Sequence, residues 1–466
     1  MTDPDEQIDR EPESLKSMDK NPWYVLATIH GEQGKAFDEE LHAQNRGVWN
    51  RWAGLMFWEG SERVAIAEAL GVNPSELSPL SNDAKLTKLV ESEFKRRIGP
   101  SAKIPEPKHG CDFGKTRFST KLCMNQFIFP RSADFCLAKF ESEAMLSGVL
   151  FEGDAFFGSA TFAMSSKFDS VCFRKSGSFR GCHFLGECEF NAASFGGVAW
   201  FDSARFDKEA RLTKIDFGND VFFRKAMVKG NFRMCRSEFR SYSNFSETKF
   251  EREVDLSDAH FRHTTNFRGV EFVRSFPELS GTILHPNTIF TAEDAYWPPT
   301  KGSIAKTSRD SVAIIRHTIS KQGSPEDEHY FFRREMGFRA RIGGFWQRLP
   351  YALYQCLSDF GYSIRRPVIS LSLLWFLFGA LFFCFSVNSS PFQETDMQSL
   401  LVRLGAAFAL SFANIFAFLG FHGRFAPDIF DGAGPVQVFL SAFQTVAGFI
   451  LLFFLGLGLR TRFRLR

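Results

Sequence analysis

The sequence predicts a mainly β protein built around a solenoid, with a helical segment before it and a hydrophobic helical module after it. One observation is compositional: the 466 residues include 57 Phe, against 7 Tyr and 8 Trp. Such a bias indicates that one type of site recurs along the chain. The others are a strict apolar period in the middle of the sequence and three long uncharged segments near its end.

The apolar period consists of two ladders, each with a step of eleven residues. One ladder starts at Phe113 and the other starts five residues later, at Phe118, and neither slips over fifteen units. All 30 ladder positions are apolar, and 24 of them are Phe, which we call the ladder phenylalanines. They are Phe113, Phe118, Phe129, Phe135, Phe140, Phe151, Phe157, Phe162, Phe168, Phe173, Phe179, Phe184, Phe190, Phe195, Phe201, Phe206, Phe217, Phe223, Phe239, Phe245, Phe250, Phe261, Phe267 and Phe272.

An eleven-residue period is also found in right-handed coiled coils, so a helical interpretation has to be tested. On a helix, a step of five residues rotates the side chain by roughly 140°, so the two ladders would occupy separate faces and form no common seam. Gly and Ser are also frequent between the Phe residues, which is unfavourable in a long helix. We therefore reject the helical interpretation.

The position two before each ladder residue indicates short strands instead. It is Ala at eleven of these positions, including Ala133 and Ala204, and none of the 30 is charged. A small inward residue and a large inward residue, separated by an outward one, follow the alternation of a β-strand. A corner after each strand would close the coil.

This pattern resembles the pentapeptide-repeat family, whose unit has a small residue two before a central Leu or Phe. The segments 204–206 (Ala-Arg-Phe) and 259–261 (Ala-His-Phe) match it, and the resemblance covers roughly residues 111–275. The units here alternate between five and six residues, as in the Phe-rich branch. The resemblance implies a right-handed quadrilateral β-helix with roughly 22 residues per four-sided coil, and a bacterial origin.

The flanks have different compositions. The first residues are polar and charged, with no apolar signal sequence. An aromatic-rich segment follows, with Trp23, Tyr24, Trp49, Trp52 and Trp58, and we expect it to cap the open end of the solenoid. The predicted organisation is 1–20 disordered tail, 21–110 helical N-terminal cap, 111–276 solenoid, 277–302 linker, 303–366 helical hairpin and juxtamembrane segment, and 367–466 transmembrane module.

The predicted hairpin consists of helices at 308–321 and 325–341. From Phe331 to Arg348 the chain mixes aromatic and basic residues. Such a helix would suit an anionic membrane surface, and a soluble helix packed on the solenoid is an equal alternative.

The transmembrane module contains uncharged segments at 368–387, 404–421 and 436–459, each near the length that crosses a bilayer. Arginines precede the first segment and follow the last. Three full spans would place one arginine cluster outside, against the positive-inside bias, whereas two spans around a re-entrant 404–421 keep both clusters inside. We favour two spans, with three as the alternative. The topology residues are Arg365, Arg366, Arg460, Arg462, Arg464 and Arg466.

No residue pattern indicates a catalytic reaction or a bound cofactor. No catalytic, cofactor-binding or metal-binding motif is present, so we predict no enzyme activity, no cofactor and no small-molecule substrate. The nine cysteines form no CxxC pair and fit free thiols. Residues 113–274 hold 24 Lys plus Arg and 20 Asp plus Glu, the wrong sign for mimicry of DNA, although Arg224, Lys225, Lys229, Arg233, Arg236 and Arg240 form a local basic cluster.

These observations favour a multi-pass protein of the inner (cytoplasmic) membrane with its solenoid in the cytosol. Its partners would be the lipid bilayer and an unknown protein, and its role that of a non-enzymatic interaction scaffold. The alternative is an ion-channel-like pore with two spans, which would require a homo-oligomer. No selectivity-filter sequence follows 404–421, and Asn414 is the only amide there, where we expect a helix–helix hydrogen bond.

Overall fold

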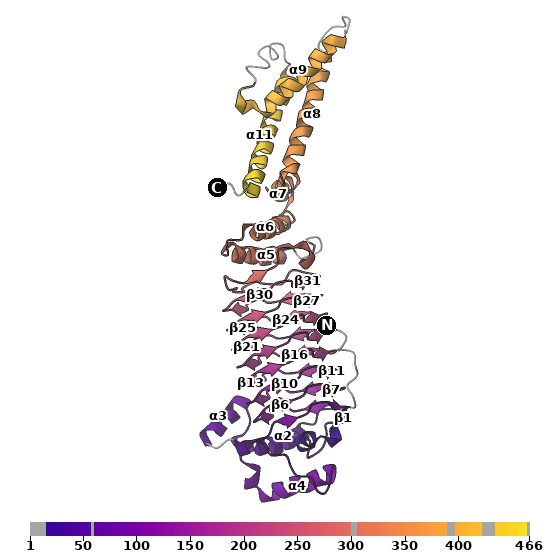
Figure 1. The fold of residues 1–466 in the computed structure, drawn as a ribbon, viewed down its shortest axis with the longest axis vertical. Coiled ribbons are helices and arrows are strands. Elements are labelled where there is room, and N and C mark those ends of the chain that lie inside the picture. Colours follow the sequence, from indigo (N-terminus) through magenta and orange to yellow (C-terminus); the bar gives the residue numbers. More distant parts are fainter. Residues whose placement is uncertain (1–14, 57–59, 300–304, 389–396, 422–433, 464–466) are drawn as a thin grey trace, which may run out of the picture. The chain divides into compact units, whose positions relative to one another are not determined.

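The structure is a computed structural model that describes residues 15–56, 60–299, 305–388, 397–421 and 434–463. The chain forms two compact units, Met1–Glu335 and Met336–Arg466. The first unit contains a parallel β-solenoid with helices at both of its ends (Figure 1).

The solenoid has four parallel sheets, because each strand pairs with the strand four positions further along the chain. Sheet A contains β1 (Lys16–Ser17), β3 (Thr116–Phe118), β7 (Lys139–Phe140), β11 (Thr161–Phe162), β15 (His183–Phe184), β19 (Arg205–Phe206), β23 (Met227–Val228), β27 (Lys249–Phe250) and β31 (Glu271–Phe272). Sheet B contains β2 (Cys111–Asp112), β6 (Ala133–Asp134), β10 (Ala155–Phe156), β14 (Gly177–Ser178), β18 (Ala199–Trp200), β22 (Val221–Phe222), β26 (Ser243–Asn244), β30 (Thr265–Phe267) and β32 (Ile289–Phe290).

The other two sheets are shorter. Sheet C contains β4 (Leu122–Cys123), β8 (Ala144–Met145), β12 (Ser166–Lys167), β16 (Cys188–Glu189), β20 (Ala210–Arg211), β24 (Phe232–Arg233) and β28 (Val254–Asp255). Sheet D contains β5 (Ile128–Phe129), β9 (Leu150–Phe151), β13 (Cys172–Phe173), β17 (Ser194–Phe195), β21 (Asp216–Phe217), β25 (Glu238–Phe239) and β29 (His260–Phe261). The predicted solenoid with four-sided coils is therefore confirmed.

One corner type requires left-handed backbone. A residue with positive φ recurs every eleven residues, from Lys115 (φ 51°) to Gly269 (φ 68°), and this residue is Gly at positions 148, 181 and 269. Each lies in the five-residue spacing between the two ladders, where the chain turns most tightly. The six-residue spacing turns with an extra residue instead and has no left-handed residue. Alternation between five and six residues therefore reflects two corner geometries.

The N-terminal cap contains α1 (Pro22–Ala27), α2 (Glu39–Ala53), α3 (Gly60–Leu70) and α4 (Ala84–Ile98), with short 3-10 helices η2 (Met18–Lys20), η3 (Gly54–Met56), η4 (Pro74–Leu77) and η5 (Leu80–Asn82). Side chains of Asn21, Asp38 and Asp83 cap the amide groups that begin α1, α2 and α4. Trp23, Tyr24, Trp49 and Trp52 are buried, whereas Trp58 lies outside the described residues.

Side chains of the cap form hydrogen bonds with backbone groups at the open edge of the first coil. The Asn50 side chain donates to Gln126 O (3.0 Å) and accepts from Ile128 N (3.1 Å), in place of a further strand on sheet D. Trp49 Nε1 donates to Ile128 O at 2.8 Å. On sheet B, Asn21 Nδ2 donates to Asp112 O at 2.9 Å. These bonds protect an edge that would otherwise be available for pairing with another chain.

The predicted disordered tail is too long. Lys16–Ser17 forms β1, which extends sheet A beyond β3, and Met18 is buried. The polar composition of this segment predicts disorder, but its backbone gains hydrogen bonds from the edge of the sheet. Residues 1–14 lie outside the described residues.

The predicted linker at 277–302 is instead partly solenoid. Glu278 and Ile283 form bridges with the preceding coil, and β32 pairs Phe290 with Phe267. The partners here are 23 residues apart rather than 22, so one extra residue ends the strict ladder without ending the coil. The 3-10 helix η6 (Asp294–Tyr296) follows.

Helices α5 (Ala305–Ser320) and α6 (Pro325–Arg339) correspond to the predicted hairpin and cover the C-terminal end of the solenoid. Phe331 is buried with its ring 5.1 Å from that of Trp297, which in turn stacks on Phe272. Gln322 Nε2 donates to Thr288 O at 2.6 Å. This part of the basic and aromatic segment therefore packs on the solenoid as a second cap.

The second unit contains α7 (Phe345–Ser358), α8 (Arg365–Asn388), α9 (Met397–Ile415), the 3-10 helix η7 (Ala417–Leu419) and α11 (Pro435–Phe463). Helices α8, α9 and α11 pack against one another. Each is long and apolar enough to cross a membrane, by length and composition. The middle helix begins earlier than the predicted 404–421, because the helix includes Arg403, which interrupts the apolar run in the sequence.

Candidate functional site

The ladder phenylalanines are all buried, with at most 4% of any side chain exposed. On sheet B, nine rings from Phe113 to Phe290 form one continuous stack, with neighbouring centroids 4.6–5.1 Å apart. This spacing matches the distance between hydrogen-bonded strands. The ladder is thus the structural core, and the residues available to a partner are the outward ones.

One coil departs from the ladder in two compensating ways. Val228 stands where sheet A otherwise carries Phe, and Phe232 stands in a position that is elsewhere small or aliphatic. The Phe232 ring lies 6.4 Å from Phe206 and 5.2 Å from Phe250, the Phe residues of the coils before and after Val228. Phe232 therefore fills the volume that Val228 leaves. The ladder prediction did not detect this exchange.

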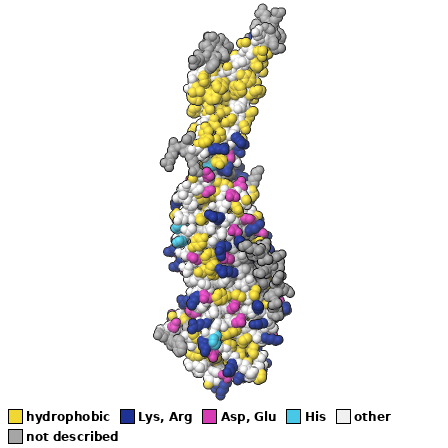
Figure 2. Space-filling view, viewed as in Figure 1, with side chains coloured by type: hydrophobic (Ala, Val, Ile, Leu, Met, Phe, Trp, Pro, Cys, Tyr) yellow, Lys and Arg dark blue, Asp and Glu magenta, His cyan; other side chains and the backbone are white. Residues whose placement is uncertain are grey.

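The basic cluster on the outer surface is neutralised across coils. Each of its six residues pairs with a carboxylate on an adjacent coil, such as Arg224 with Asp202 (2.7 Å) and Lys229 with Asp207 (2.9 Å). The remaining pairs are Lys225–Glu247, Arg233–Glu209, Arg236–Asp258 and Arg240–Asp216. Hydrogen bonds from Arg211 hold the pKa of Glu209 below its ordinary value. Figure 2 shows both signs of charge interspersed over the solenoid, so this surface offers no extended basic field.

Partly exposed aromatic side chains lie at the outer face of sheet B, three of them in its strands and the fourth just before β26, and we call them the aromatic strip: Phe156, Trp200, Phe222 and Tyr242. Trp200 stacks on Phe222 with centroids 4.4 Å apart, and Phe156 is 40% exposed. The guanidinium of Arg180 lies 3.7 Å from the centroid of the Trp200 ring. Sequence analysis missed this strip because it followed only the inward positions. A step of 22 residues along the outward positions could have shown Phe156, Trp200 and Phe222, whereas Tyr242 does not fall on that step.

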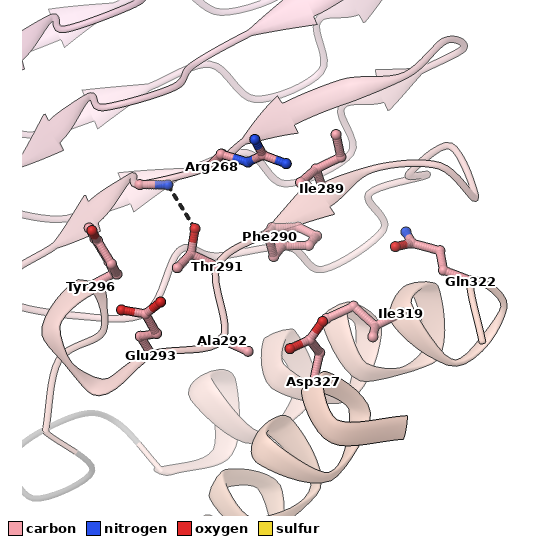
Figure 3. Close-up of a pocket in the computed structure, with 11 residues that line it drawn as sticks. Arg268, Ile289, Phe290, Thr291, Ala292, Glu293, Tyr296, Ile319, Gln322 and Asp327 are labelled. Atoms are coloured by element: carbon pink, nitrogen blue, oxygen red, sulfur yellow. Dashed lines mark hydrogen bonds between the residues drawn. The ribbon is translucent and has the colours of Figure 1, made fainter. Parts of the chain in front are cut away.

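A pocket of about 440 Å³ lies at the C-terminal end of the solenoid, between β32, η6 and the two capping helices (Figure 3). Arg268 faces it from the last full coil, Glu293 and Tyr296 from one side, and Gln322 and Asp327 from the other. Gly269 N donates to Thr291 Oγ1 at 2.8 Å at its wall. The polar groups are spread around the rim, and no nucleophile is paired with a base among them.

A second pocket of about 440 Å³ lies between α2 and the first coils of the solenoid. His42 lines it, only 6% exposed, and Nδ1 of its ring lies 3.3 Å from Cys123 Sγ. Burial lowers the pKa of His42 to about 4 and raises the pKa of the Cys123 thiol to about 11. Both groups are therefore neutral at pH 7. A neutral thiol is a poor nucleophile, so this contact is a packing and hydrogen-bonding interaction.

Two buried cysteines and a stacked pair of histidines lie in the solenoid. Cys182 and Cys188 are fully buried in the small inward positions, and burial raises the pKa of each thiol well above its ordinary value. His263 stacks on His285 with centroids 5.8 Å apart. Among the described residues, no group of three or more His, Cys, Asp or Glu could hold a metal ion.

In the second unit, α8 and α11 are antiparallel and α9 reaches only part of their length. A Cβ on Gly458, near the end of α11, would lie 3.3 Å from Ser363 O, just before α8 begins. A Cβ on Gly448 would lie 3.0 Å from Cα of Ile415, where α9 ends. These glycines are ten residues apart, about 15 Å along the helix. Helix α9 therefore stops about 15 Å short of that end of the bundle.

Four buried polar side chains hold the end of α9 in place, and we call them the polar quartet: Ser411, Asn414, Ser441 and Gln444. Asn414 Nδ2 donates to Gln444 Oε1, and Ser441 Oγ donates to Asn414 Oδ1, both at 2.9 Å. Gln444 Nε2 donates to Ser411 Oγ at 2.6 Å, and Ser411 Oγ donates to Trp375 O on α8 at 2.8 Å. The expected helix–helix hydrogen bond of Asn414 is thus present.

The arginine clusters lie at one end of this bundle. Arg365 and Arg366 begin α8, and Arg460 and Arg462 lie just after Gly458, which packs against Ser363. All four are exposed, whereas Arg464 and Arg466 lie outside the described residues. The rest of the bundle surface is predominantly hydrophobic (Figure 2).

A fold of four parallel sheets with strands of two or three residues defines a class of β-solenoids, here with five or six residues per side. The family model described as "Pentapeptide repeats (9 copies)" matches residues 179–227, within the central coils. The central coils of the β-solenoid therefore carry pentapeptide repeats, and the surrounding coils continue the same four-sheet architecture. Comparisons with curated proteins and with solved structures give no match.

Proposed function

We propose that this chain is a scaffold of the inner membrane, anchored by α8 and α11 and presenting its solenoid to protein partners in the cytosol. The observation that carries the proposal is the aromatic strip. Many of the outer charges are paired across coils, whereas Trp200, Phe222 and Tyr242 form a run of aromatic rings with neighbouring centroids 4.4 and 6.2 Å apart. Aromatic residues and arginine are enriched in protein interfaces, and contiguous exposed apolar surface is typical of binding sites. Because both ends of the solenoid are capped, a partner would bind to a lateral face of the solenoid rather than to the strands at its ends.

The orientation follows from the arginines. Two antiparallel helices place Arg365, Arg366, Arg460 and Arg462 together, and arginines next to spans favour the cytosolic side. Helix α9 begins at the opposite end of the bundle and stops about 15 Å short of the arginine end, which supports two spans with a re-entrant helix. Three full spans are the alternative, because α9 is long enough to span by itself. On this topology, residues before α8 are cytosolic.

The same plan of two helices around a re-entrant helix supports the second candidate, an oligomeric ion-conducting pore. Here the polar quartet favours anchoring, because its bonds join helices within one chain and the four side chains are at most 6% exposed. Conductance of purified protein in planar bilayers separates the candidates: stepwise currents above those of empty bilayers would support the pore.

The test of the scaffold uses a photo-crosslinking amino acid at Phe222 in living cells, with Lys167 as the matched control. Lys167 points outward from sheet C and is exposed. We expect discrete protein adducts from position 222 and none from position 167. Equal adducts from both positions, or none from position 222, would contradict the strip as the binding face.

A further inference from the structure

Helix α7 carries an apolar face that its own unit does not cover. Phe345, Trp346 and Leu353 are 69%, 79% and 50% exposed. They fall within about 100° of one another on a helical projection, together with Leu349. The opposite face packs on the bundle, where the Tyr354 ring stacks on Phe454 of α11 with centroids 5.4 Å apart.

The position of α7 relative to α8 is fixed. Asp359, Phe360 and Gly361 have φ of 51°, 55° and 81°, a sharp left-handed turn between the two helices. Arg366 Nη1 donates to Gln355 O at 2.6 Å, near the C-terminal end of α7 where a cation is favourable. A Cβ on Gly361 would lie 2.9 Å from the Tyr354 hydroxyl, which leaves little room for another arrangement.

This turn places α7 at the arginine end of the bundle. Arg348, Arg365, Arg460 and Arg462 are all exposed there, and Asp359 is the nearby carboxylate. An apolar helical face beside a hydrophobic bundle, with arginines at the same level, matches the layered chemistry of a bilayer surface: acyl chains, then anionic headgroups.

We infer that α7 lies in the headgroup layer, with Trp346 among the upper acyl carbons and the arginines bound to anionic phospholipid. The inference rests on the proposed function, because it requires the bundle to be in a membrane. It adds that the second unit binds anionic phospholipid selectively, and that α7 determines how deeply this unit lies in the bilayer. Each arginine near an anionic surface contributes about 1 kcal/mol to such binding.

The test uses the full-length protein in nanodiscs of equal phosphatidylglycerol and phosphatidylcholine, with and without bromine on the upper acyl carbons. The emission of Trp346 is obtained as the difference between the spectra of the wild type and of Trp346→Phe. The emission of Trp200 in the solenoid, obtained in the same way from Trp200→Phe, is the control. We expect bromination to remove most of the Trp346 signal and none of the Trp200 signal.

Lipid selectivity is read from the phospholipid retained on the protein after detergent extraction. We expect phosphatidylglycerol to be enriched on the wild type. We expect no enrichment on the triple variant Arg365→Gln, Arg460→Gln and Arg462→Gln. If Trp346 is not quenched in protein that resists alkaline extraction, this inference is overturned while the proposed anchor stands. The same holds if phosphatidylglycerol is not enriched on the wild type. A blue-shifted but unquenched Trp346 would point to a second copy on this face and also overturns it. Release of the protein by alkaline extraction contradicts the proposed anchor itself.

Discussion

At the scale of single residues, the inward positions decide stability and the outward positions are free to serve binding. The chain offers a matched pair for this comparison, because Phe195 is 1% exposed in the sheet D stack and Phe156 is 40% exposed on sheet B. Both are Phe residues in short strands of the same solenoid. The same substitution therefore has a different consequence at each.

Phe195→Asp should unfold the solenoid, because the carboxylate would be buried between the rings of Phe173 and Phe217 without a partner. Phe156→Asp should leave the melting temperature within a few degrees of wild type. Thermal melts of the detergent-solubilised protein by circular dichroism make the comparison. Equal melting temperatures for the two variants would refute the assignment of faces.

The exchange at Val228 and Phe232 predicts coupled substitutions. Phe232→Ala leaves a cavity and should cost about 3–5 kcal/mol. Val228→Phe overfills the core and should cost about 1–3 kcal/mol. The double variant restores the regular ladder, so its loss of unfolding free energy should be smaller than the sum of the two. Denaturant titrations of the four proteins measure this, and strict additivity would show that the two side chains do not share a volume.

At the scale of elements, the helix α9 depends on the polar quartet for its end position. Asn414→Ala removes the acceptor of Ser441 and the donor to Gln444, and leaves both buried without that partner. Hydrogen bonds between membrane helices contribute about 0.6 kcal/mol on average, so the loss should be of the order of 1 kcal/mol. Unfolding in mixed micelles compares Asn414→Ala with Phe412→Ala, an exposed position on α9. A larger loss at Phe412 would show that packing, rather than the quartet, holds α9.

The elements also show how far the sequence is predictive. The eleven-residue step predicts the strands because each coil repeats one inward pattern. It ends at Phe272 because one extra residue shifts the last coil, and a fixed step does not detect such a shift. The capping role of α5 and α6 depends on Phe331 meeting Trp297, a contact between distant parts of the chain. Three members of the aromatic strip could be predicted at a step of 22, whereas the point at which α9 ends within the bundle depends on helix packing, which hydropathy does not describe.

At the scale of the whole molecule, two units carry two kinds of surface. The first is a capped solenoid with many ion pairs across its coils and with the aromatic strip on one of its faces. The second is a hydrophobic bundle with arginines gathered at one end. A repeat solenoid is a structural fold stabilised by neighbouring coils. Under the proposed function, the second unit would hold the solenoid at the membrane and the aromatic strip would bind its partner.

The central claim is that both arginine clusters, and with them the solenoid, lie on the cytosolic side. Reporters active only in the cytosol or only in the periplasm, fused after Arg466 and separately after Met397, test it directly. We predict a cytosolic C-terminus and an external Met397. An external C-terminus would instead require three full spans, and would contradict the two-span anchor and the re-entrant α9.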